Sequence, residues 1–220
     1  MYPEYINEAD ILFCPSNANF AYDTTAGVFN CKNDRTSICP CRFGRRSYIY
    51  LGWVSTSEML VPPATDPNSP YLGFADFKPS VMDLFNNLLM SLPVPTVEAH
   101  SASVDRDIPY SEYNASDPYV LYRTREGIER FFVTDINDPA ASAMAQTTIA
   151  VMFDEIGTHA PSHAHFFNHV PGGANVLFMD GHVEYITYPG KWPVTSATCL
   201  FMGFFNPLWE RFAQSGHPYP

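Results

Sequence analysis

The sequence predicts an α+β protein: an antiparallel sheet with a C-terminal Asp-Gly hairpin, one main helix near 80–92 and many irregular loops. The dipeptide Asp180-Gly181 separates two runs rich in apolar and β-branched residues, which is the pattern of a β-hairpin. Residues 80–92 have the apolar spacing of an amphipathic helix. Twenty prolines and twelve glycines among 220 residues indicate long stretches without regular structure.

The expected strands are short and widely spaced. Six segments combine β-branched, aromatic and other apolar residues and end at turn signals: 10–14, 47–54, 119–122, 148–153, and the hairpin arms 175–179 and 182–188. Gly52 is expected as a bulge within the second segment, and Asp154 lies at the end of the fourth. Residues 139–146 have the composition of a short helix that begins at a proline.

The main helix has start and stop signals in the sequence. Ser80 is expected to cap it, with Asp83 completing a capping box. Pro93 ends it. Its apolar face is predicted to contain five residues: Val81, Leu84, Phe85, Leu88 and Leu89.

The length of the hairpin loop predicts which residues face each other across the two strands. A two-residue type I′ loop at Asp180-Gly181 would place Met179 opposite His182 and Phe178 opposite Val183. The short carboxylate of Asp180 is expected to bond its own turn backbone.

Five cysteines are present, and four of them fall in the first 41 residues: Cys14, Cys31, Cys39 and Cys41. In a secreted protein this density indicates a local disulfide framework. Cys39 and Cys41 are too close to pair easily with each other, so each is expected to pair with Cys14 or Cys31. Cys199 is left unpaired or intermolecular. A zinc site from the first four is the alternative, but the Cys-x-x-Cys pairs typical of such sites are missing.

A family resemblance centres on the hairpin. Ten residues separate His169 from Asp180-Gly181, and the intervening Gly172-Gly173-Ala174-Asn175 precedes an apolar run. This pattern resembles the His…Asp-Gly signature of bacterial pilin-like proteins related to type II secretion pseudopilins, which abound in planctomycetes. Weaker likeness extends upstream to residues 125–142, 151–154 and 13–16, so that it covers most of residues 1–190.

The resemblance implies a non-enzymatic, extracellular or cell-surface subunit that assembles with itself into a filament, a pilus-like fibre or a surface layer. Residues 1–190 would form the pilin-like headgroup, and residues 191–220 an aromatic extension. Family members begin with a basic leader and a long apolar helix. This sequence shows neither, which predicts either a fragment or mature form, or a headgroup that assembles without the helix.

The extension carries a heavy aromatic load. We expect it either to pack on its own domain or to contact a neighbouring subunit, through Phe201, Phe204, Phe205, Leu208 and Trp209. In the second case, deletion of residues 194–220 is predicted to leave a folded, soluble monomer.

The sequence suggests two candidate metal sites, although the same residue types are also expected in turns and helix caps. The first groups Asp154 and Asp180 with the clustered histidines; of these, His169 and His182 belong to the family signature. The second is a calcium site in irregular backbone. The resemblance supports it, because secreted pseudopilins use calcium to hold headgroup loops. Its oxygen donors would come from Asp105, Asp107, Asp135 and Asn137. No cofactor is required by the structural reading.

Two rival functions remain open. A metal-dependent hydrolase would use the cluster His163, His165, His169 and His182, whereas a carbohydrate-binding module would use Trp53, Trp192 or Trp209 as stacking platforms. No nucleophile elbow, P-loop or dinucleotide motif is present. The net charge of −11 argues against a nucleic-acid partner, and no apolar run reaches membrane-spanning length. Asn114 opens the single eligible glycosylation sequon.

Overall fold

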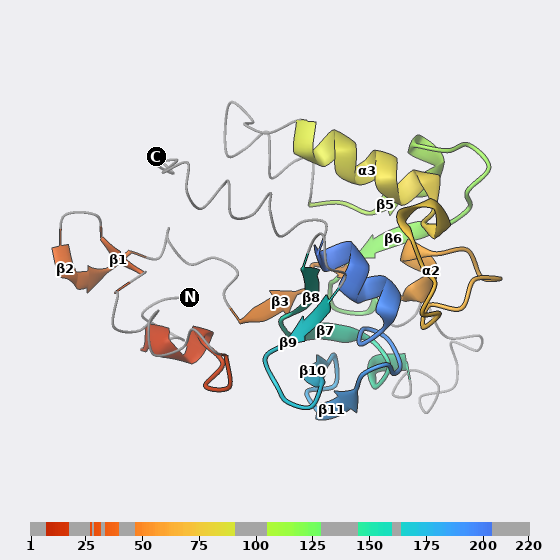
Figure 1. Cartoon of the computed structure of the whole chain (residues 1–220). Helices are drawn as coiled ribbons and strands as arrows, with labels where there is room; N and C mark the ends of the chain where they lie inside the picture. Colours follow the sequence, from red (N-terminus) through yellow and green to blue (C-terminus); the bar gives the residue numbers. More distant parts are fainter. Residues whose placement is uncertain are drawn as a thin grey trace.

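The computed structural model describes residues 8–17, 27, 29–31, 34–39, 47–90, 105–128, 145–159 and 164–203. Within them, every paired strand is antiparallel, and short helices flank the sheets (Figure 1). The predicted α+β class with antiparallel sheets is therefore confirmed. In the described residues no helix is long and apolar enough to cross a membrane.

A four-stranded sheet organises the molecule. Its order is β11-β10-β7-β3, and its strands are β3 (Tyr48–Tyr50), β7 (Ala150–Asp154), β10 (Gly173–Phe178) and β11 (Val183–Thr187). The register places Tyr50, Met152, Leu177 and Val183 in one cross-strand row. We call the side of the sheet that carries this row the outer face. Residues that alternate with the row, including Phe153 and Val176, point into the core and are buried.

Smaller sheets complete the β structure. β4 (Trp53–Val54), β5 (Ile108–Pro109) and β6 (Val120–Arg123) form a three-stranded sheet, and β8 (Ile156–His159) pairs with β9 (Ala164–Phe167). Near the N-terminus β1 (Asn30–Cys31) pairs with β2 (Asp34–Ile38). The remaining elements are short helices: η1 (Ala9–Leu12), α2 (Ser57–Leu60), η3 (Phe74–Asp76), α3 (Pro79–Met90) and η4 (Tyr110–Glu112).

The predicted strand at 47–54 is divided between two sheets. Tyr48–Tyr50 pairs with β7, whereas Trp53–Val54 pairs with β6. The break falls at Leu51-Gly52, where a bulge was predicted. The guanidinium of Arg123 bonds the Gly52 carbonyl, so the small residue leaves room for a side chain from the neighbouring strand.

The hairpin register differs from the prediction by one residue. Leu177 lies opposite Val183, and the Phe178 amide donates to the His182 carbonyl. The Gly181 amide donates to the Phe178 carbonyl at 2.9 Å, and Gly181 has a φ of 91°. These contacts describe a three-residue loop, a type I turn followed by a glycine in the left-handed region, in place of the two-residue loop. An Asp-Gly dipeptide fits either loop, so the pairing of the two flanking strands determines which loop forms.

One helix prediction and one strand prediction also need correction. The main helix α3 begins at Pro79, and Ser80 does not cap it, because the Ser80 hydroxyl donates to Asp117 at 2.7 Å. Residues 10–14 are not a strand: Ala9–Leu12 is a 3-10 helix, with Ala9 and Phe13 packed beside Phe29 in a small cluster.

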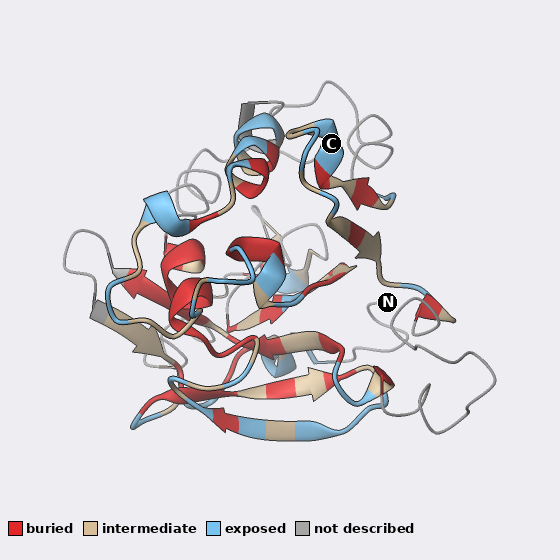
Figure 2. Cartoon of the chain, turned by 90° about the vertical axis from the view of Figure 1, so that its right-hand side faces the viewer, coloured by how far each residue is buried: buried red, intermediate tan, exposed pale blue. Residues whose placement is uncertain are grey.

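Two buried clusters lie on either side of the helix formed by residues 196–203. Figure 2 shows buried residues, in red, gathered where helices and strands face each other, while β11 at the sheet edge alternates exposed and buried positions. One cluster joins α3 to η4 and β6, and the other covers the core side of the four-stranded sheet. Trp192 and Met202 pack against both clusters. Residues 192–202 therefore contribute to the core.

This placement bears on the predicted aromatic extension. Val194, Ala197 and Cys199 have no exposed surface, and Phe201 packs edge-on against Phe85 at 4.6 Å between ring centres. Phe201 thus contacts its own domain, the first of the two alternatives. Deletion of residues 194–220 would remove these buried side chains, so we expect the truncated chain to be unfolded rather than a folded monomer. Phe204, Phe205, Leu208 and Trp209 lie outside the described residues.

The cysteines form one disulfide in the described part of the chain. Cys31 and Cys39 are bonded, whereas Cys14 and Cys199 are free and buried. The expected pairing of Cys14 is corrected, and a zinc site from the first four cysteines is excluded because two of them are oxidised. Cys41 lies outside the described residues.

Candidate functional site

Three potential ligand side chains meet at the outer face of the four-stranded sheet. Cys14 follows the helix η1, Asp154 is the last residue of β7, and His169 lies in the loop between β9 and β10. One donor atom from each lies within 4.8 Å of the other two. This is the group in the described residues that could hold a metal ion. We call these three residues the Cys-Asp-His cluster.

Asp154 is held in place by its neighbour on β10. Its Oδ2 accepts hydrogen bonds from the backbone amide of Asn175 at 2.7 Å and from the side-chain amide of the same residue at 2.8 Å. The carboxylate is only 2% exposed. A buried charge of this kind needs polar partners, because burial without them is costly. The fold therefore fixes one oxygen of Asp154 at the site.

His169 presents a single nitrogen to the cluster. Its Nε2 lies 2.9 Å from Asp154 Oδ2, 3.5 Å from Cys14 Sγ and 3.1 Å from Asn175 Nδ2. The adjacent Asn168 anchors this loop by donating to the Ser47 carbonyl at 2.9 Å. The His169 side chain is 24% exposed, so it forms the solvent-accessible side of the cluster.

A pocket opens beside the cluster. It has a volume of about 390 Å³, and its lining includes all three residues of the cluster. Cys14, Pro15 and Ser16 line it from the N-terminal segment, while strand residues such as Met152 and Leu177 belong to the outer face. Tyr48 also lines it, and burial, with added repulsion from Cys14 and Asp154, raises the pKa of its hydroxyl.

The geometry does not match a nucleophilic triad. In such a triad one ring nitrogen of histidine contacts the nucleophile and the other contacts the carboxylate. Here the thiol of Cys14 and the carboxylate of Asp154 both approach Nε2 of His169.

The other histidines in the predicted metal sites occupy separate places. His182 Nδ1 contacts Asp180 Oδ1 at 2.6 Å in the hairpin turn. The same carboxylate oxygen accepts from the His182 amide, which confirms that Asp180 bonds its own turn. His165 contacts the Thr158 hydroxyl at 2.7 Å between β8 and β9. His163 lies outside the described residues. The described histidines thus do not gather around His169.

The carboxylates of the predicted calcium site are bound by arginines. Asp105 accepts from the Arg123 side chain at 3.0 Å, and Asp107 from Arg125 at 2.9 Å. Asp135 and Asn137 lie outside the described residues, so the calcium site stays a prediction. Asn114 Oδ1 accepts from Ser116 within the sequon, and glycosylation likewise stays a prediction.

The tryptophans offer little open ring surface in the described residues. Arg123 lies over the Trp53 ring at 5.3 Å, and the Trp53 indole donates to the Arg106 carbonyl. Trp192 packs against both buried clusters. Trp209 lies outside the described residues. The carbohydrate-binding alternative stays a prediction.

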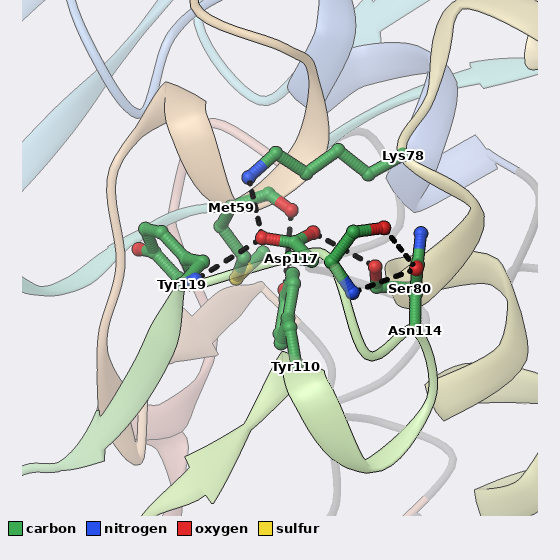
Figure 3. Close-up of polar contacts among 8 residues, drawn as sticks. Met59, Lys78, Ser80, Tyr110, Asn114, Asp117 and Tyr119 are labelled. Carbon is green, nitrogen blue, oxygen red and sulfur yellow. Dashed lines mark hydrogen bonds and ion pairs between the residues drawn. The ribbon is translucent and has the colours of Figure 1, made fainter.

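A second polar cluster lies away from the pocket, around Asp117. Figure 3 shows its carboxylate receiving hydrogen bonds from Ser80 at 2.7 Å and from the Tyr119 amide at 3.1 Å, with Lys78 at 3.4 Å. The Lys78 ammonium also lies 4.8 Å from the centre of the Tyr119 ring. The cluster ties α3 to the segment between η4 and β6, which is a structural role.

Sequence reasoning found some members of the Cys-Asp-His cluster but not their grouping. The predicted metal site includes Asp154 and His169, whereas Cys14 is predicted in a disulfide, and Asn175 appears only in a predicted strand and in the family signature. The available signal was the position of Asp154 at a strand end, together with the resemblance of the segments around all three residues to one family. Comparison of the chain with protein-family models, curated proteins and solved structures gave no match.

Proposed function

We propose that the protein is a non-enzymatic structural subunit, extracellular or at the cell surface, that assembles with copies of itself into a filament or surface layer. The observation that carries the proposal is the row of large apolar side chains that crosses the outer face of the four-stranded sheet. Tyr50 and Val183 lie at the two ends of its cross-strand row and are 62% and 61% exposed. Large apolar side chains grouped in this way are typical of contact surfaces.

The edges of the same sheet add a second contact mode. Among the described strands, β3 and β11 each have a neighbour in this sheet on one side only. Unpaired backbone groups at a sheet edge can pair with a strand of another molecule. Tyr50 lies on one edge strand and Val183 on the other, so apolar side chains accompany both edges.

The disulfide is the reason for proposing an extracellular location. The Cys31–Cys39 bond fits an oxidising environment such as the cell exterior. The resemblance of residues 169–183 to pilin-like proteins supports the same location and the same kind of assembly.

The test is assembly of the purified chain, followed by negative-stain electron microscopy and analytical ultracentrifugation over a range of concentrations. Wild-type protein is expected to form regular polymers. The double variant Tyr50→Lys and Val183→Lys is expected to remain small, because two charges would have to be buried in the contact.

Tyr71→Lys is the matched control. Tyr71 is 91% exposed, and it lies in the turn region after α2 rather than on the sheet. Polymers should persist in this variant. A wild-type chain that stays monomeric at every concentration, or a double variant that polymerises like wild type, contradicts the proposal.

A further inference from the structure

We propose that Cys14, Asp154 and His169 form a zinc site that has three protein ligands and a fourth position facing the pocket. This inference goes beyond the proposed assembly role and does not depend on it. It rests on the chemical types of the three donor atoms, on the distances among them, and on the number of neighbours that one ring nitrogen of His169 can satisfy.

The donor set selects the kind of ion. Thiolate sulfur, imidazole nitrogen and carboxylate oxygen are the three ligand classes of zinc in proteins. Calcium and magnesium prefer oxygen ligands, so a site with one sulfur and one nitrogen does not suit them. Cys14 is a free thiol, which leaves its sulfur available as a thiolate ligand.

The distances approach those of a tetrahedral site. Zinc bonds of about 2.3 Å to sulfur and about 2.05 Å to nitrogen place these two atoms about 3.6 Å apart at the tetrahedral angle. Cys14 Sγ and His169 Nε2 lie 3.5 Å apart. Nitrogen and oxygen ligands would lie about 3.4 Å apart, and His169 Nε2 lies 2.9 Å from Asp154 Oδ2. Zinc binding would therefore lengthen the His-Asp contact by about half an ångström.

The limited hydrogen-bonding capacity of the His169 ring nitrogen favours a bound cation at this position. Its Nε2 lies within contact distance of the Cys14 sulfur, the Asp154 oxygen and the Asn175 amide nitrogen. A ring nitrogen carries either one proton or one lone pair, so it can satisfy only one of these neighbours fully. A zinc ion among the three ligands would accept lone pairs from nitrogen, sulfur and oxygen together.

Asn175 has the position of a supporting residue. Its two nitrogens donate to the Asp154 oxygen that faces the site, and thereby orient the carboxylate. Partners of this kind tune the affinity of a metal site without touching the ion, and their loss costs about 10–100-fold in affinity. Asn175 is a positioning residue in this proposal.

The pocket supplies the open position. All three ligands line the pocket, and the His169 side chain is partly exposed to solvent. A zinc site with three protein ligands keeps its fourth position for water or another small ligand. We assign water to that position.

The first experiment titrates metal-free protein with Zn²⁺ alone by calorimetry, and with Co²⁺ as a spectroscopic probe of thiolate coordination. We expect one ion per chain and a sulfur-to-cobalt charge-transfer band. Cys14→Ser should abolish the band, and His169→Gln should lower zinc affinity at least 100-fold. Asn175→Ala should lower it about 10–100-fold.

Matched controls use the same residue types elsewhere in the chain. Cys199→Ser removes a different free cysteine, His182→Gln removes the histidine of the hairpin turn, and Cys41→Ser removes the cysteine that lies outside the described residues. All three should bind zinc with wild-type affinity and give the wild-type cobalt spectrum. Circular dichroism verifies that each variant is folded.

A further measurement needs no variant. Zinc should slow alkylation of Cys14 in the native wild-type chain, as followed by peptide mass mapping. Absence of zinc binding at micromolar concentration, a charge-transfer band that survives in Cys14→Ser, or alkylation of Cys14 that proceeds at the same measurable rate with and without zinc would each overturn the proposal.

Discussion

At the scale of single residues, Asp117 gives the clearest dependence on pH. Burial alone would raise the pKa of this carboxyl, but hydrogen bonds from Ser80 and from the Tyr119 amide, with the charge of Lys78, outweigh it and lower the pKa. A pKa lowered by folding stabilises the protein above the pKa of the unfolded chain. That stability is lost as pH falls through the folded value. We therefore expect the free energy of unfolding to decrease below about pH 4.

The variant Asp117→Asn tests this expectation. It should lower the free energy of unfolding near neutral pH by about 1–3 kcal/mol, because Ser80 and Lys78 lose their charged acceptor. It should also flatten the decrease on the acid side. Urea unfolding at several pH values between 7 and 3 measures both effects.

Glu112→Gln is the control for Asp117. Glu112 forms a two-pronged ion pair with Arg106, but both side chains are exposed to solvent. Exposed pairs contribute little to stability. An equal loss of stability in the two variants would show that the buried position of Asp117 has no special weight.

Cys199 is expected to be protected from thiol reagents. Its side chain has no exposed surface, and burial raises the pKa of its thiol to about 12. Because the thiolate is the reactive form, iodoacetamide at pH 8 should modify Cys199 only after urea unfolds the chain. Peptide mass mapping identifies the modified cysteine. Rapid modification of Cys199 in the native protein would contradict the described packing.

At the scale of elements, the helix of residues 196–203 fits closely against β8. A Cβ atom added at Gly203 would lie 2.4 Å from the carbonyl oxygen of Thr158 and 2.9 Å from its Cβ. The backbone cannot yield easily there, so Gly203→Ala should lower the free energy of unfolding by about 1–3 kcal/mol. Thermal unfolding followed by circular dichroism measures the change.

Gly73→Ala is the matched control for Gly203. Its added Cβ would meet only Asp76 Oδ2, at 3.9 Å, and the residue has an ordinary φ of −130°. Its stability should stay close to that of wild type. If Gly203→Ala were equally harmless, the contact between the helix and β8 would be looser than described.

Elements with strong local signals could be predicted from the sequence, but their partners could not. The spacing of Val81, Leu84 and Phe85 predicts α3 correctly because it reflects one continuous apolar face. The cap at Ser80 failed, since Asp117 lies 37 residues away and competes for its hydroxyl. The hairpin register failed because Asp-Gly suits two loop lengths of nearly equal quality.

The candidate site shows the same limit more strongly. His169 is separated by 155 residues from Cys14 and by 15 from Asp154, and the order of strands decides that they meet. Spacing rules find ligands that share a local motif, whereas this cluster is assembled by tertiary structure. The clustering of histidines in this stretch of sequence was a misleading local signal, because His165 lies on β9 and contacts Thr158, whereas His169 lies in the loop that follows β9.

At the scale of the whole molecule, the predicted extension consists of residues 191–203, which the structure describes, and residues 204–220, which lie outside the described residues. Residues 194–203 contribute buried side chains to both clusters, so a chain ending at 193 should fail to fold. A chain ending at 203 keeps every described buried residue and should unfold cooperatively in urea. Comparison of the two truncated proteins by circular dichroism tests this division.

The longer truncated chain also tests the remaining aromatic residues of the extension. Phe204, Phe205, Leu208 and Trp209 are proposed assembly contacts. If they are needed, a folded chain that ends at residue 203 should stay small under conditions in which the full chain polymerises. If this chain formed polymers of unchanged appearance, these aromatic residues would not be needed, and the outer face alone would account for assembly.

The division of residues 48–54 between two sheets has a consequence for synthesis on the ribosome. Tyr48 pairs with Asp154, and Trp53 pairs with Arg123, so each half waits for a partner made much later. Pairings this distant in sequence form slowly. Until about a hundred more residues emerge, the nascent chain carries an unpaired, aromatic-rich strand, which is the kind of segment that chaperones bind. A newly made chain would therefore need shielding at this segment until its second half has left the exit tunnel.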